Sequence, residues 1–328
     1  MNMKMTYALQ KSDIAETYKQ IKKHIRKTPL EYSPHYSRIT ETDVYLKLEN
    51  RQVTGSFKAR GAAAKLLSLK DKDYEKGVVT VSAGNHALGV AYALWRLNRN
   101  GLIILPENAS KTKVNALREY PVNMEFHGED YDKAEQYTVK YVKENDKVFV
   151  SPYNDPVVIK GQSTAAFEIF TELRDCDVLL VPVSGGGLLA GTLLCREALG
   201  LKTQIYGIQS EASPALKESL IAGRIVEIPV EDSVADGLHG NIEPGSITFD
   251  IIRDNNVEDI LLVSEDEIKQ QFYEYIIYQH DLIEASAAVN IAALKRYKNL
   301  FRGKKTVCLM TGSNISPDLL KEMLEYKS

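Results

Sequence analysis

The chain has 328 residues, of which 44% are hydrophobic and 26% charged, and its net charge is −3. These values are typical of a soluble globular protein of roughly two domains. Without a basic block or a long apolar run, they exclude a nucleic-acid partner and a membrane span from the functions we expect. The three cysteines lack the spacing of a metal site, and no secretory signal is visible, so we expect free thiols and a cytoplasmic protein.

Short β-like runs alternate along the chain with stretches of helical length. The first strand is predicted at 44–48, and the second, at 78–81, ends just before an apolar helix at 87–95. Further strands are predicted at 102–105, 148–150, 178–183, 204–209, 260–263 and 306–310. This alternation predicts parallel βαβ units and a doubly wound α/β protein.

Lys58 follows Gly55-Ser56-Phe57 at the start of a helical-looking run. A lysine amine becomes a useful nucleophile when it is partly desolvated, and it can then hold an aldehyde cofactor as a Schiff base. For this residue alone, a solvated lysine at a helix start is the simpler interpretation. Two glycine-containing loops further along the chain favour the cofactor.

Ser184-Gly185-Gly186-Gly187-Leu188 joins an apolar strand to a helix. Glycines let the backbone approach an anion, and the helix start offers unpaired N–H groups, so the loop predicts a phosphate site. An ordinary tight turn is one alternative. A dinucleotide site is another, because Gly185, Gly187 and Ala190 match its fingerprint, but the next strand ends at Gln209 where that site expects an acid.

Ser82-Ala83-Gly84-Asn85-His86 lies at a second strand-to-helix junction and also offers backbone N–H donors to an anion. The alternative is a plain helix cap, since Ser82 and Asn85 are both good capping residues. We do not assign His86 as the catalytic base. Asn154, in Pro152-Tyr153-Asn154-Asp155-Pro156, is a further candidate site residue, but on local sequence an ordinary turn residue is about as good an interpretation.

Taken together and in this order, the segments resemble the fold-type II pyridoxal-phosphate enzymes, the family of threonine and serine dehydratases, serine racemase and cysteine synthase. The matching segments are residues 47–61, 82–87, 184–188 and 311–314. The resemblance implies two doubly wound domains of the tryptophan synthase β kind. The large cofactor-binding domain would be formed by 1–67 and 151–328, and the small, mobile, substrate-side domain by 68–150.

The resemblance also assigns the site. Lys58 would be the catalytic lysine. The cofactor, pyridoxal 5'-phosphate, would be bound by Lys58, Phe57, Asn85, Asn154, Ser184, Gly185, Gly186, Gly187, Leu188 and Thr311. The carboxylate of a small amino-acid substrate would be bound by Ser82, Ala83, Gly84, Asn85 and His86.

Two positions help to choose a reaction within the family. The Thr311 hydroxyl would meet the pyridine nitrogen and leave it neutral, which makes the ring a weaker electron sink and suits β-elimination. Ala83 stands where racemase-like members carry a proton-donating serine, so dehydration is favoured over racemisation. Gln209, Ser213 and Ala215 replace the acidic residues of the racemase cation site, so no metal is expected.

The sequence therefore predicts a dehydratase (ammonia-lyase) that converts a 3-hydroxy amino acid, L-threonine or L-serine first, to a 2-oxo acid and ammonia. A homodimer is the family's usual assembly. Two alternatives stay open: a β-replacement synthase of the cysteine synthase kind, and a cofactor-binding regulatory protein without turnover.

Overall fold

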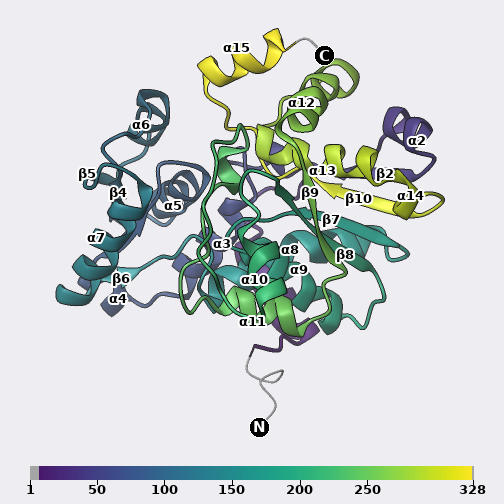
Figure 1. Cartoon of the computed structure of the whole chain (residues 1–328). Coiled ribbons are helices and arrows are strands. Elements are labelled where there is room, and N and C mark those ends of the chain that lie inside the picture. Colours follow the sequence, from purple (N-terminus) through teal and green to yellow (C-terminus); the bar gives the residue numbers. More distant parts are fainter. Residues whose placement is uncertain (1–6, 327–328) are drawn as a thin grey trace.

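The protein is described by a computed structural model over residues 7–326, and its framework is two separate β-sheets (Figure 1). The larger has the strand order β1-β2-β10-β7-β8-β9, with β1 antiparallel to β2 and the other pairs parallel. Its strands are β1 (Leu30–Tyr32), β2 (Asp43–Lys47), β7 (Val178–Pro182), β8 (Gln204–Ser210), β9 (Asp259–Val263) and β10 (Lys305–Leu309).

The smaller sheet has the order β5-β4-β3-β6 and is parallel throughout. Its strands are β3 (Val78–Val81), β4 (Gly101–Leu105), β5 (Asn123–Phe126) and β6 (Val148–Phe149). Figure 1 shows this sheet with α5, α6 and α7 on one side of the molecule, apart from the larger sheet. All four strands fall inside the predicted small domain, whose boundaries stay a prediction.

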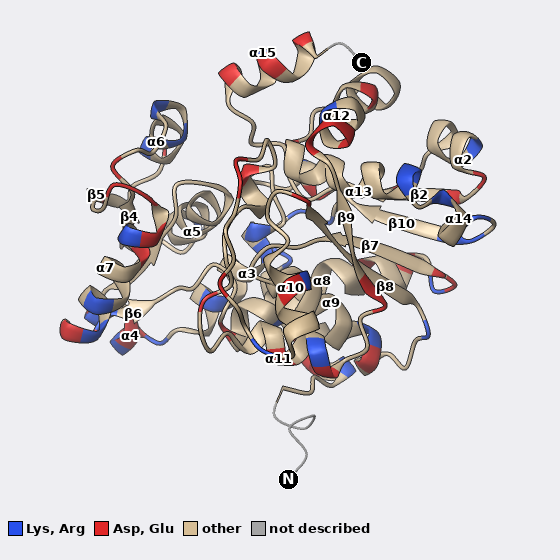
Figure 2. Ribbon diagram, in the orientation of Figure 1, with Lys and Arg blue, Asp and Glu red and all other residues tan. Residues whose placement is uncertain are grey.

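The helices occupy the segments between the strands. In chain order they are α1 (Lys11–Ile21), α2 (Pro34–Thr40), the 3-10 turn η2 (Glu49–Arg51), α3 (Lys58–Ser68), α4 (Asp71–Lys76), α5 (Asn85–Arg96), α6 (Lys111–Arg118), α7 (Tyr131–Glu144), α8 (Pro156–Glu172), α9 (Gly187–Ala198), α10 (Ala215–Ala222), η3 (Asp236–Leu238), α11 (Ile247–Asp254), α12 (Glu265–Gln279), α13 (Ala285–Arg296), α14 (Lys298–Phe301) and α15 (Pro317–Glu325). Acidic and basic residues are spread over the outer helices and loops of both parts (Figure 2). Within residues 7–326, none of the helices combines the length and the apolar character needed to cross a bilayer.

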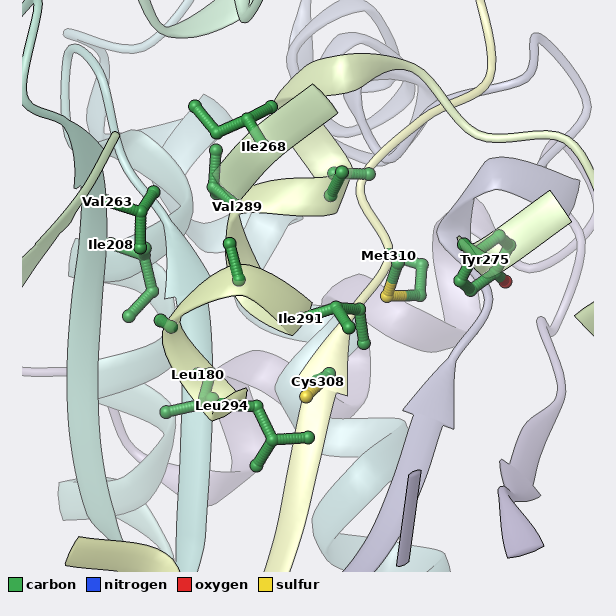
Figure 3. Close-up of a cluster of buried hydrophobic side chains, with 14 of the residues drawn as sticks. Leu180, Ile208, Val263, Ile268, Tyr275, Val289, Ile291, Leu294, Cys308 and Met310 are labelled. Carbon is green, nitrogen blue, oxygen red and sulfur yellow. The ribbon is translucent and has the colours of Figure 1, made fainter. Parts of the chain in front are cut away.

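The larger sheet is buried on both faces. Leu180 and Cys308 point into one cluster with α12 and α13, as Figure 3 shows, whereas their neighbours Leu179 and Val307 point into the cluster with α8, α9 and α11. Successive side chains of a strand point to opposite faces, so burial on both faces needs an unbroken apolar run. This is why the central strands were readable in the sequence.

The eight predicted strands are confirmed to within one residue at each end, and the predicted helix at 87–95 lies within α5. The prediction missed β1 and β5, which lie at edges of the two sheets. In β1, Glu31 and Tyr32 are exposed, and in β5 all residues but Met124 are exposed. Edge strands with open faces carry mixed sequences, so no apolar run marks them.

Candidate active site

The candidate site lies at the carboxyl ends of β7 and β10, which are neighbours in the larger sheet. In parallel α/β sheets ligands bind at this edge, where the loops after adjacent strands converge. The segment before α3 reaches the same place: Ser56 pairs with Gly312, and the Phe57 N–H donates to the Thr311 carbonyl at 3.1 Å. The lysine segment and the last motif therefore lie side by side.

Lys58 is the first residue of α3, and its Nζ donates to the Pro152 carbonyl oxygen at 2.9 Å. Burial lowers the pKa of the Lys58 amine to about 8, although the charge of Glu284 acts in the opposite direction. An amine with this pKa is partly unprotonated near neutral pH, so it can act as a nucleophile or a base.

The glycine loop after β7 has the form of an anion cradle. Gly186 has φ +86°, and α9 begins at Gly187 without a side-chain cap from the residues described, which leaves its first N–H groups open. Tyr153 lies so close that a Cβ on Gly185 would come within 2.5 Å of its ring. Asn154 is next to it, with its Oδ1 accepting from the Ile247 N–H at 2.9 Å. Glycine is therefore needed here for space as well as for conformation.

The Ser82–His86 loop opens α5, whose N-cap is Gly84. Neither predicted capping residue caps this helix: the Ser82 hydroxyl accepts from the Gly84 N–H, and the Asn85 amide is directed to Glu284. The plain-cap alternative is thus wrong, and the first N–H groups of α5 remain available to an anion.

His86 serves the structure through its side chain. The ring is buried and its Nε2 lies 3.1 Å from the Val150 carbonyl, which fixes Nε2 as the protonated nitrogen. Burial first, then the charge of Lys58, lowers the pKa of His86 to about 3. A ring held neutral and turned to the backbone is not the catalytic base.

The Thr311 hydroxyl is buried and has no hydrogen-bond partner among residues 7–326. The neighbouring Ser313 hydroxyl, by contrast, donates to the Asn50 carbonyl at 3.0 Å. An unpartnered buried hydroxyl is costly unless a ligand completes it, so of the two only Thr311 is free to meet one.

Two residues of the site were given no role from the sequence, although Asn314 lies in the matching segment 311–314. Glu284 precedes α13, and both of its carboxylate oxygens accept from Asn85 Nδ2, at 3.0 and 2.9 Å. Burial raises the pKa of the Glu284 carboxyl to about 7, against the lowering effect of the bond from Asn85. Asn314 donates to Asn85 Oδ1 at 2.6 Å. A glutamate before a helix looks like an ordinary N-cap, so no signal in the sequence could single it out.

Arg60, two residues after Lys58, points away from the site. Its guanidinium is fully buried between Glu49, at 2.7 Å, and Glu168, at 2.9 Å, and Lys47 also pairs with Glu168 at 2.6 Å. Arg60 is therefore not available to a ligand at the carboxyl edge. His239 is exposed.

Comparison with known proteins identifies the family of the chain and its cofactor. A family model described as "Pyridoxal-phosphate dependent enzyme" matches residues 21–312. The chain belongs to this family of pyridoxal-phosphate-dependent enzymes. The dinucleotide interpretation of the glycine loop is therefore wrong.

Relatives within the family match over nearly the whole chain. The catabolic L-threonine dehydratase TdcB of Escherichia coli K12 is 36% identical over 95% of this chain and 96% of its own. The solved structure of maize serine racemase has a TM-score of 0.90 at 27% identity, covering 96% of this chain and 97% of that one. The solved structure of threonine deaminase isoform 2 from Solanum lycopersicum has a TM-score of 0.89 at 29% identity, and the match covers 97% of this chain and 89% of that one.

The residues on this edge fit the family's cofactor. They supply a lysine of lowered pKa, a glycine cradle at an uncapped helix start for a phosphate, and the unpartnered Thr311 hydroxyl for a ring atom. The family shares the two-sheet α/β fold that the sequence predicted.

Proposed function

We propose that the chain is a pyridoxal-phosphate-dependent ammonia-lyase that converts L-threonine or L-serine to a 2-oxo acid and ammonia. The observation that carries the proposal is the combination of a lysine of lowered pKa with a neutral hydroxyl, Thr311, on one sheet edge. Because a hydroxyl leaves the ring nitrogen neutral, the pair suits elimination, in which the leaving group departs early. The names of the E. coli and Solanum relatives support the same reaction.

When bound, the cofactor supplies an aldehyde that an amine can join and a ring that accepts the electrons of the substrate's Cα–H bond. Lys58 would hold the cofactor and, once freed by the substrate amine, would remove the α-proton. Its pKa of about 8 lets it do so near neutral pH. The proton that Lys58 takes up would pass to the β-hydroxyl, which would leave as water, and the released enamine would be hydrolysed by water to the 2-oxo acid and ammonia.

The remaining site residues would bind and orient. The backbone of the loop 184–188 would hold the phosphate, with Phe57 and Asn154 beside the cofactor. Asn85 would donate to the ring oxygen and Thr311 to the ring nitrogen. The open N–H groups at the start of α5, in the loop Ser82–His86, would hold the substrate carboxylate.

Ala83 supports elimination over racemisation. Inverting Cα requires a proton donor on the face opposite the lysine, and alanine has no proton to give. A member of this family with alanine here is therefore expected to release product rather than return the opposite enantiomer.

The charges around the site favour a substrate with a neutral side chain. A second carboxylate would need an additional cation. Arg60 is committed to Glu49 and Glu168, His86 is neutral, and Lys113 pairs with Asp236 at 2.7 Å. We accordingly expect L-threonine and L-serine to be turned over much faster than L-threo-3-hydroxyaspartate.

The test is 2-oxo acid release from these three amino acids by protein loaded with cofactor, with Lys58→Ala as the control. Release from L-threonine or L-serine, absent in the control, is the expected result. If product formed only after a thiol was added, the protein would be a β-replacement synthase. A normal cofactor spectrum without any product from a broad amino-acid panel would instead indicate a binding protein.

We also propose a cytoplasmic homodimer built from the two predicted domains, 1–67 with 151–328 and 68–150. The three cysteines are free thiols, which supports the cytoplasmic location because that compartment is reducing. Exposed apolar side chains on the second half of α12 and nearby support the dimer: Tyr32, Tyr273, Ile277, Tyr278 and Leu282. Light scattering during gel filtration would measure the mass in solution, and a monomer would contradict the dimer.

A further inference from the structure

Four groups form a continuous chain of hydrogen bonds across the candidate site. Asn314 Nδ2 donates to the Thr54 carbonyl oxygen at 2.8 Å and to Asn85 Oδ1 at 2.6 Å. Asn85 Nδ2 in turn donates to both oxygens of Glu284. The chain joins α5, next to the smaller sheet, to three segments of the larger part.

Which group donates and which accepts in these hydrogen bonds is set at one end by a backbone carbonyl. A carbonyl oxygen can only accept a hydrogen bond, so the Thr54 carbonyl obliges Asn314 to turn its NH2 group toward it. The second hydrogen of that NH2 group goes to Asn85, which must therefore present its oxygen to Asn314. The Asn85 NH2 group consequently faces the other way, toward Glu284, and this orientation does not depend on how either amide was assigned.

One hydrogen of the Asn85 NH2 group is left over. The two oxygens of a carboxylate lie so close together that a single N–H reaches both, whereas the two N–H bonds of an amide diverge widely. The remaining N–H of Asn85 is thus free to donate to an oxygen acceptor in the site.

Gly55 makes room for this chain of hydrogen bonds. Its φ is +69°, and a Cβ there would lie 2.8 Å from Asn314 Oδ1. The glycine three residues before Lys58 therefore serves the position of the Asn314 amide, as well as the turn.

We infer that Asn314 and Glu284 are positioning residues that hold the Asn85 amide with one N–H free to donate to the ring oxygen of the cofactor, in a direction imposed by the Thr54 carbonyl. The inference rests on the proposed contact between Asn85 and the cofactor. It does not depend on which amino acid is the substrate.

The test measures cofactor binding without substrate, by the dissociation constant and by the share of bound cofactor that absorbs with a neutral ring oxygen. Asn314→Asp keeps the size of the side chain but replaces the NH2 donor by an oxygen. That oxygen would face two other acceptors, the Thr54 carbonyl and Asn85 Oδ1. We expect it to weaken cofactor binding about tenfold and to increase the neutral-oxygen share. Glu284→Gln, whose amide oxygen still accepts from Asn85, should change affinity by less than about threefold.

Two further variants make the outcome decisive. Asn255→Asp is the matched control, because Asn255 also donates to a backbone carbonyl, that of Ile251, but lies at the end of α11. It should leave the spectrum unchanged. Asn85→Ala tests the proposed contact itself: if it too leaves cofactor binding unchanged, that contact is absent and the proposed site is wrong.

The inference would be overturned if Asn85→Ala altered the spectrum while Asn314→Asp bound cofactor like the wild type. It would also be overturned if Asn314→Asp lowered only the melting temperature of the cofactor-free protein, since that is a purely structural effect. If Asn314→Asp fails to fold, Asn314→Ser takes its place, because serine keeps one hydrogen-bond donor. This variant should lose cofactor affinity to an intermediate degree. Affinity equal to that of the wild type would count against the inference.

Discussion

The Lys58 amine donates a hydrogen bond of 2.9 Å to the carbonyl oxygen of Pro152, two residues before Asn154. A backbone carbonyl holds the amine in place without a counter-charge, so burial can lower the pKa of Lys58 to about 8. An ion pair at the same position would have raised it. This relationship makes the lysine reactive before any cofactor arrives.

The rate of cofactor attachment should follow the unprotonated fraction of Lys58. Below pH 8 that fraction rises about tenfold per pH unit, and above pH 8 it levels off. Stopped-flow absorbance between pH 6 and 9 would measure the rate. Lys58→Ala should show no covalent attachment by mass spectrometry after reduction. A rate that is flat from pH 6 to 8 would mean that the pKa of the amine lies elsewhere.

Thr311→Val should separate the stability of the protein from its binding of cofactor. Valine has the same shape without the unpartnered hydroxyl, so the cofactor-free protein should gain about 1 kcal/mol while cofactor affinity falls. Urea unfolding and spectroscopic titration would measure the two effects.

Thr306→Val is the matched control, because Thr306 in β10 also carries a buried hydroxyl without a partner among the described residues. It should stabilise the protein in the same way and leave cofactor affinity unchanged. Equal loss of affinity in both variants would remove the special role of Thr311.

Glu284 should make the stability of the cofactor-free protein fall as pH rises. Its pKa is about 7 in the folded state and 4.5 in the reference state, so between these values the folded protein binds more protons and the slope of stability against pH is negative. The total is on the order of 3 kcal/mol. Glu284→Gln should therefore be more stabilising at pH 8 than at pH 5.

Chemical unfolding at the two pH values measures this difference. Glu75→Gln, at an exposed glutamate of α4, is the control and should show no such pH dependence. If the Glu284→Gln effect were the same at both values, the Glu284 carboxyl would not titrate between them.

Arg60→Met should destabilise the fold by about 3–5 kcal/mol, because it leaves Glu49 and Glu168 buried with only Lys47 to neutralise them. Arg302→Ala removes an exposed pair with Glu41 and should cost far less than Arg60→Met, because solvent screens exposed charges. Denaturant midpoints of the two variants give the comparison. Similar midpoints would show that the buried charges are stabilised by something other than Arg60.

Much of the fold could be predicted because its central strands are buried on both faces. Residues 178–182 and 78–81 are fully buried; the first appears in the sequence as an unbroken apolar run, and the second is apolar except for Thr80. Strands β1 and β5 could not be found in this way, since each lies at an edge with a face open to solvent.

The sequence by itself determined the family, and it predicted the roles of the lysine and the glycine loop, because each of these motifs consists of residues close together in the chain. A strand, a glycine turn and a helix start form locally, and their order is written in the sequence. Only the tertiary structure decided which side chains complete the site. Glu284 meets Asn85 across 199 positions, Asn314 meets Asn85 across 229, and Arg60 turns into the core toward Glu168, 108 positions away. No local pattern encodes such distant partners, because the position of each side chain is set by how the two sheets and their helices pack.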